Sequence, residues 1–210
     1  NEADLIAFFE PQQVALTKGG ASKLVHSVRL MMEKELLRKE QGEEAEEEMV
    51  VCKIDATNAF NSDSRASVVE ALVQEPSLKH LAWSTACQLA PCYGLENRGE
   101  KWGEGEEGVT QGDPPASPQF CASWHQPVRE LDAALAPEGM AKFGMDDGYC
   151  VGYPSTLFPA LLRFAREVEE KCNIQLNLRK CEVFTWSGQL PAGTPPGMTL
   201  AGVEVEGVWE

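Results

Sequence analysis

Several features that would place a chain in a special class are missing from this sequence of 210 residues. No stretch approaches 18 consecutive apolar residues, and no basic segment followed by an apolar one opens the chain. We therefore expect neither a membrane span nor a secretory signal. Together with the scattered cysteines, odd in number, which indicate a reducing compartment, this leads us to expect the protein inside the cell, in the nucleus or the cytoplasm. The first residue is Asn1 rather than methionine, from which we expect a fragment of a longer polypeptide.

Paired cysteine motifs and phosphate-binding glycine motifs are also lacking. The seven cysteines are odd in number and include no CxxC, which argues against a disulfide framework and against a zinc knuckle. Cys121 and His125 lie four residues apart on an expected helix, but no second pair with zinc spacing accompanies them. The absence of GxxxxGK[ST] and of GxSxG gives no support to a P-loop enzyme or a serine hydrolase.

Positive charge is scarce. The 33 acidic residues outnumber the 18 basic ones and give a formal net charge of −15, which by itself argues against binding to a phosphate backbone. Most of the excess lies in three places, however: 12 of the 15 negative charges fall in residues 40–48, in residues 96–107 and in the last seven residues. The acidity therefore leaves a nucleic-acid enzyme possible. The 43% of hydrophobic residues suffices for a packed core.

The order of expected elements indicates an α+β protein. A helix is predicted for residues 20–39, where apolar residues recur at three-to-four spacing behind Ser22 as a candidate cap. The segment 96–107 is expected to be a loop between two short strands, and Asp147-Gly148 is expected to form a hairpin turn with the aspartates at its tip. The remaining expected helices are 65–74, 78–89, 117–135 and 156–172, and the expected strands are 49–56, two around 146–148, NIQLNL, CEVFTW and a final hairpin.

Acidic residues stand at the ends of two separate strands in this scheme. Asp55 ends the first strand, and Asp146 and Asp147 lie in the later hairpin. Carboxylates from two strands can meet only if the strands are neighbours in one sheet, and such a meeting is what a two-metal site for phosphoryl transfer needs. Taken alone, the aspartate pair has a plainer interpretation as a polar turn.

Five segments in this order resemble the reverse transcriptase domain of non-LTR retrotransposons, the LINE-like elements. They are EPQQVALTKGGASKLVHSVRLMME, KIDATNAF, EGVTQGDPPASPQF, GMDDGY and LNLRKCEVF. The resemblance implies a polymerase palm: an antiparallel, ferredoxin-like (split βαβ) sheet backed by helices, with part of the fingers. Residues 1–48 would connect fingers to palm, 49–186 would form the palm, and 187–210 would begin the connection to the thumb. Gly144 stands where the family has an aromatic residue, with Phe143 displaced by one position.

The resemblance also implies the metal ligands. Asp55 and Asp146 would bridge two Mg²⁺ ions, or Mn²⁺, with Asp147 as an auxiliary carboxylate whose alternative is a turn residue. The carbonyl oxygen of Ala56 would complete one coordination shell.

Four further residues would contact substrate. Phe60 would pack beneath the sugar as a steric gate, or else be a core aromatic. Gln111 and Gly112 of the QGDP turn would shape the nucleotide pocket, and Lys180 would act near the leaving pyrophosphate, or else be a surface lysine. The expected partners are an RNA template, a DNA primer, a dNTP and other domains of a polyprotein, with no membrane.

The expected activity is RNA-directed DNA polymerisation. Two alternatives stay open: a decayed or domesticated copy that retains the fold as a binding or structural module, and an unrelated acidic interaction domain. The resemblance further implies that the finger strands precede Asn1 and that most of the thumb follows Glu210, so we expect this fragment alone to be weakly active or inactive.

Overall fold

The computed structural model describes residues 2–43, 45–90, 96–97, 100–101, 107–110 and 112–202. The helices of this part are α1 Glu2–Phe9, α2 Gly20–Glu40, α3 Ala59–Ser62, α4 Arg65–Gln74, α5 Lys79–Gln88, α6 Ala116–Leu135 and α7 Pro154–Cys172. The strands are β1 Val50–Ile54, β2 Ala56–Thr57, β3 Glu96–Asn97, β4 Glu100–Lys101, β5 Met140–Gly144, β6 Asp147–Gly152, β7 Gln175–Leu176, β8 Glu182–Phe184 and β9 Thr199–Leu200. None of these helices is long and apolar enough to cross a membrane.

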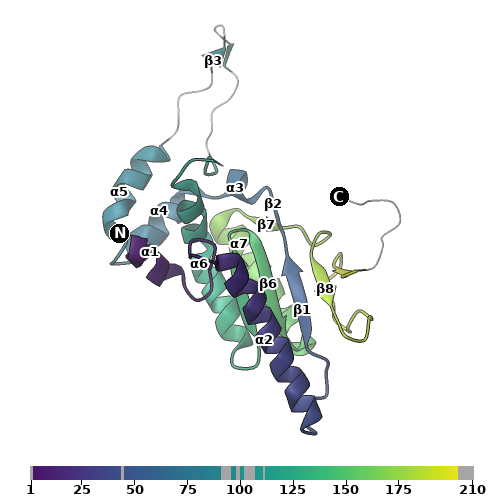
Figure 1. The fold of residues 1–210 in the computed structure, drawn as a ribbon. Helices are drawn as coiled ribbons and strands as arrows, with labels where there is room; N and C mark the ends of the chain where they lie inside the picture. The colour runs from purple at the N-terminus through teal and green to yellow at the C-terminus, as the bar shows by residue number, and fades with distance from the viewer. Residues whose placement is uncertain are drawn as a thin grey trace.

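A five-stranded sheet in the order β5-β6-β1-β8-β9 forms the centre of the molecule (Figure 1). The pairs β5·β6, β6·β1 and β1·β8 are antiparallel, as expected, but β9 runs parallel to β8, so the sheet is mixed. The chain returns through residues 185–198 before β9 and therefore enters it in the same direction as β8. Residues 203–210 of the expected final hairpin lie outside the described part of the chain, and the described residues before them contain β9.

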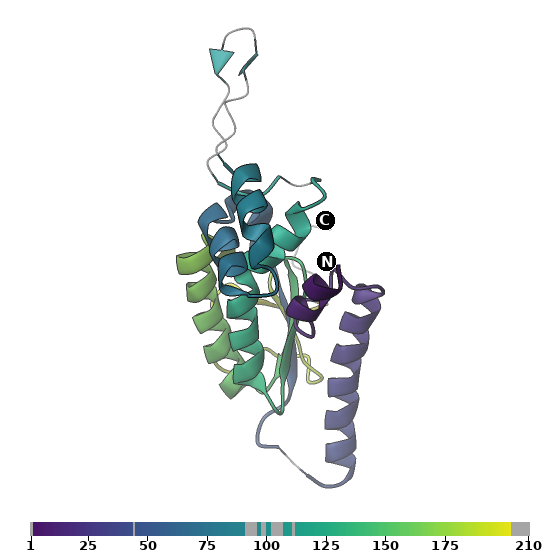
Figure 2. The ribbon, with the colours of Figure 1, turned by 90° about the vertical axis from the view of Figure 1, so that its left-hand side faces the viewer.

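Helices cover both faces of the sheet (Figure 2). Val50, Cys52 and Ile54 of β1 point into the larger core, which they share with α6 and α7. Val51 points the other way, into a smaller apolar cluster with Met32 of α2. Because β1 is buried on both faces, it has the continuous apolar sequence from which the strand was predicted.

The long helices follow the sequence pattern closely. α6 buries all five residues expected to face the core: Phe120, Trp124, Val128, Leu131 and Leu135. It begins at Ala116 instead of at Pro118, because the preceding turn leads straight into the helix: the amide of Ala116 donates to the Asp113 carbonyl at 3.0 Å. α2 matches its expected range, but Gly19 at φ +73° precedes it, and Ser22 caps nothing.

Two short features differ from expectation. α1 has no counterpart in the sequence prediction. In the segment 96–107 the strands β3 and β4 pair with each other within the expected loop, instead of flanking it. A charged stretch with several glycines offers no apolar alternation from which such a hairpin could be predicted.

Candidate active site

The end of β1 and the tip of the β5–β6 hairpin lie at the same edge of the sheet. β1 pairs with β6 so that Ile54 lies opposite Gly148. Asp55 follows Ile54 and Asp147 precedes Gly148, so the two aspartates continue the same pairing at neighbouring positions. Asp146 is one residue further along, at the tip. The structure thus places the three aspartates, which the sequence had assigned to two separate strand ends, at one edge of the sheet on neighbouring strands.

Two further acidic residues, Asp147 and Asp55, act electrostatically on Asp146. Burial raises the pKa of the Asp146 carboxyl above its ordinary value, and the charges of Asp147 and Asp55 raise it further. Like-charged carboxylates repel each other unless a cation lies between them. The two neighbouring charges therefore favour a bound cation at this edge of the sheet.

The donor set fits Mg²⁺ or Mn²⁺ in its chemistry, because carboxylate oxygens are the ligands these ions prefer. Within the described residues, however, no three His, Cys, Asp or Glu side chains are gathered into a ready metal site. A metal ion here would need ligands from substrate phosphates, water or backbone oxygens in addition to the aspartates.

The hairpin turn differs from the one expected. Gly144 pairs with Asp147, so the two turn residues are Met145 and Asp146, and Gly148 lies inside β6. A Cβ atom on residue 148 would lie 2.2 Å from the ring of Phe143. The glycine is thus required by the packing of Phe143 and not by a turn. The strand pairing forms with Gly144 at the position where the LINE-like elements that the sequence resembles have an aromatic residue.

Asp55 is held by the segment that connects β7 to β8. Its carbonyl accepts a hydrogen bond from the amide of Asn177 at 2.9 Å, and its own amide donates to the sulfur of Cys181 at 3.4 Å. Lys180 lies in the same turn, where its amide donates to the Asn177 carbonyl at 2.8 Å, and its side chain is exposed. Lys180 is therefore connected to Asp55 through two backbone hydrogen bonds.

The other predicted residues lie around this edge. Ala56 is in β2, opposite Leu176 of β7. Phe60, in α3, is half-buried, and its ring stacks on Phe120 with centroids 4.4 Å apart. Gly112 has φ +99°, which suits glycine, and Gln111 lies outside the described residues. The stacking of Phe60 supports the packing role that was left open.

Two buried ionisable residues lie outside the predicted site. Asp63 is fully buried, and neither of its carboxylate oxygens makes a hydrogen bond of good geometry among the described residues. Burial raises its pKa to about 8, although the side chain of Ser123 and the backbone of Ser64 lie near enough to lower it in part. His125 of α6 packs against the rings of Phe8 and Phe9, and burial lowers its pKa to about 4. Cys121 is buried as well, and it forms no metal cluster with His125 in this part of the chain.

Gln13 is a further residue near the site that the sequence did not reveal. Its side chain is fully buried and contacts the turn residue Met145. It lies in a short irregular segment between α1 and α2, where no periodic pattern distinguishes one polar residue from another.

Comparison with known proteins gives a structural match alone. No protein-family profile and no curated protein matches the sequence. The solved structure of apo telomerase from Candida tropicalis, truncated from its C-terminal domain, matches with a TM-score of 0.62. This chain shares a fold with that telomerase. The match covers 91% of this chain and 40% of the telomerase chain, at 13% sequence identity, so the likeness concerns the polymerase-like fold only.

Proposed function

We propose that the chain is the palm of an RNA-directed DNA polymerase of the retrotransposon type. The observation that carries the proposal is the placement of Asp55, Asp146 and Asp147 at one edge of the sheet, where the charges of Asp147 and Asp55 act on the Asp146 carboxyl. The fold shared with a telomerase, which is a polymerase related to reverse transcriptases, supports it. The sequence order of β1, β5, β6 and β8, with helices after β1 and after β6, fits the split βαβ sheet expected of a palm.

The proposed reaction joins a deoxynucleotide to a primer. The 3′ hydroxyl of the primer loses its proton to water, and its oxygen forms a bond to the α-phosphorus of the dNTP. The bond from that phosphorus to the bridging oxygen breaks, which releases pyrophosphate. Two bound Mg²⁺ ions would supply charge stabilisation for the attacking and leaving oxygens. Asp55 and Asp146 would hold them, with Asp147 and the Ala56 carbonyl as additional oxygen donors.

The other predicted residues would position the nucleotide and neutralise the charge of the pyrophosphate. Lys180 is exposed in the turn next to Asp55 and would donate a proton or a countercharge to the pyrophosphate. Phe60, which is half-buried in α3, would pack beneath the sugar. Gln111 and Gly112 would line the nucleotide pocket.

Primer extension with Asp146→Asn tests the proposal. An RNA template, a DNA primer, dNTPs and Mg²⁺ are supplied to the chain, and to a longer polypeptide that contains it. The variant is expected to lose about 100-fold or more in rate, because it removes one charge from the metal-binding pair. Glu130→Gln, an isosteric change on the surface of α6 that keeps the contact with Gln126, is the control and should leave the rate unchanged. Equal rates for Asp146→Asn and wild type would contradict the mechanism.

One observation favours a second candidate, a palm that binds nucleic acid without catalysis. The described residues contain no ready set of three metal-ligating side chains. In that case the wild-type protein would bind a primer–template duplex and give no extension product with either Mg²⁺ or Mn²⁺.

A further inference from the structure

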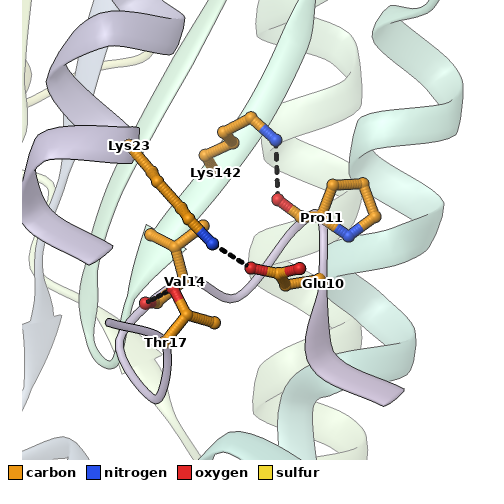
Figure 3. A network of polar contacts seen from close by, with 6 residues as sticks. All are labelled: Glu10, Pro11, Val14, Thr17, Lys23 and Lys142. Atoms are coloured by element: carbon orange, nitrogen blue, oxygen red, sulfur yellow. Dashed lines mark hydrogen bonds and ion pairs between the residues drawn. The ribbon is translucent and has the colours of Figure 1, made fainter. Parts of the chain in front are cut away.

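The segment that connects α1 to α2 is attached along the outer edge of β5. The amide of Phe143 donates to the Gln12 carbonyl at 2.8 Å, and the amide of Val14 donates to the Phe143 carbonyl at 2.9 Å. The Nζ of Lys142 in β5 donates a hydrogen bond to the carbonyl oxygen of Pro11 at 2.6 Å (Figure 3). These contacts fix the backbone on both sides of Gln13.

Figure 3 also shows how the connecting segment is closed at its other side. Lys23 in the first turns of α2 pairs with Glu10, and the hydroxyl of Thr17 donates to the Val14 carbonyl at 2.9 Å. The segment is therefore held by both β5 and α2, and these contacts fix the position of the Gln13 backbone.

The side chain of Gln13 binds the backbone of one residue through two hydrogen bonds. Its Oε1 accepts from the amide of Met145 at 2.9 Å, and its Nε2 donates to the carbonyl of Met145 at 3.0 Å. Gln13 is fully buried, so water does not compete for these bonds. A primary amide offers a donor and an acceptor at one end without carrying a charge at any pH.

Met145 is the residue that needs such support. Its φ is +65°, in the left-handed region that a side chain without a local polar group rarely adopts. Met145 is directly followed by Asp146 at the tip of the hairpin, so its backbone conformation sets the direction in which the Asp146 side chain leaves the turn. Sparsely populated conformations persist where the surroundings hold them, and they are frequent at functional sites.

We propose that Gln13 is a positioning residue, which holds Met145 in its left-handed conformation and thereby aims the carboxyl of Asp146 toward Asp55. The conformational part of this inference stands on the geometry alone. Its consequence for catalysis rests on the proposed function.

Gln13→Met tests the conformational part, with Gln12→Met as the matched control. Both variants remove a side-chain amide from the same segment, but Gln12 donates to Asp132 and not to the turn. Amide hydrogen exchange of Met145, followed by NMR, should become about tenfold faster or more in Gln13→Met and stay within about twofold in Gln12→Met. Unchanged exchange in Gln13→Met would overturn the inference.

A second change separates positioning from simple packing. Glycine adopts positive φ readily, so Met145→Gly should make the turn independent of the clamp. In the Met145→Gly background, Gln13→Met should therefore alter the exchange of the Asp147 amide much less than it does with Met145 present. If Gln13→Met alone does not fold, the double variant decides: its failure to fold as well would show a packing role and overturn the proposal.

Metal binding and kinetics test the catalytic consequence. Mn²⁺ binding, measured by electron paramagnetic resonance, should weaken about tenfold in Gln13→Met, and kcat should fall while KM for the dNTP changes less than about twofold. A wild-type protein that neither binds Mn²⁺ nor extends a primer would refute the proposed function, and the exchange measurements would still decide the clamp. Normal Mn²⁺ binding and kcat in Gln13→Met would overturn the positioning role.

Discussion

At the scale of single residues, the pKa values of two buried ionisable groups, Asp63 and His125, shift in opposite directions for the same reason. Burial disfavours the charged form, so it raises the pKa of Asp63 to about 8 and lowers that of His125 to about 4. Both residues are therefore neutral in the folded protein near pH 7. They make the stability of the protein depend on pH, and the two dependences have opposite signs.

Because of the Asp63 carboxyl, the folded protein should become less stable as the pH rises. Its folded pKa lies above its ordinary value near 4, so the folded state holds a proton that the unfolded state releases, and stability falls between about pH 4 and pH 8. His125 has the opposite dependence, but only between about pH 4 and 6.5. Between pH 6.5 and 8 the loss assigned to Asp63 is about 2 kcal/mol, at about 1.4 kcal/mol per pH unit.

Asp63→Asn should remove this loss. Urea denaturation at pH 6.5 and pH 8 should show a nearly constant free energy of unfolding for the variant and a falling one for the wild type. Asp113→Asn changes an exposed carboxylate and serves as the control, which should keep the wild-type dependence. A slope that persists in Asp63→Asn would mean that another group causes it.

At the scale of elements, the sequence predicted best where periodicity is long. α2, α4, α6 and α7 and the strand β1 were located within a few residues because their apolar faces repeat over many positions. The hairpin turn was predicted two residues too late, at Asp147-Gly148 instead of Met145-Asp146, because Asp-Gly is a strong turn signal locally, whereas Gly148 is required by the ring of Phe143. The clamp of Gln13 joins segments 132 residues apart, and no local pattern carries such information.

The docking of α2 onto the sheet involves a buried carboxylate. Glu35 is 2% exposed and accepts a hydrogen bond from the hydroxyl of Tyr153 at 2.9 Å. Burial, and then the bond to Glu35, raise the pKa of Tyr153 to about 12, so its hydroxyl stays protonated and remains a donor at neutral pH. Tyr153→Phe should reduce the free energy of unfolding by about 1–3 kcal/mol, measured by urea denaturation, because it removes a donor from a buried acceptor.

Tyr149→Phe is the matched comparison for this prediction. Tyr149 lies in β6 and packs against the same apolar cluster as Tyr153. The change there removes no bond to Glu35, so we expect a loss below about 0.5 kcal/mol. Similar losses in the two variants would show that the Glu35 contact contributes little to the docking of α2.

At the scale of the whole molecule, the net charge of −15 opposes nucleic-acid binding in general, but its distribution limits the effect. Residues 40–48, which begin at the last residue of α2, contain six glutamates. Within this segment Glu47 accepts a hydrogen bond from the amide of Ser155, and Glu48 accepts one from the amide of Ser187, so part of it is bound to the protein surface. Weak binding of a primer–template duplex, with a shallow salt dependence, is therefore expected.

Replacing two exposed glutamates tests this expectation. Glu40→Gln combined with Glu46→Gln should tighten the binding of a labelled RNA–DNA duplex about two- to fivefold at 50 mM salt, measured by fluorescence anisotropy, and less at 200 mM, where charges are screened over shorter distances. The pair Glu40→Asp and Glu46→Asp keeps the charge and should bind like the wild type. An equal gain at both salt concentrations would show that the glutamates act through contact and not through charge. With no gain at either concentration, the acidic segment would lie too far from the bound duplex to oppose it, and the weak binding would have to come from too few phosphate contacts.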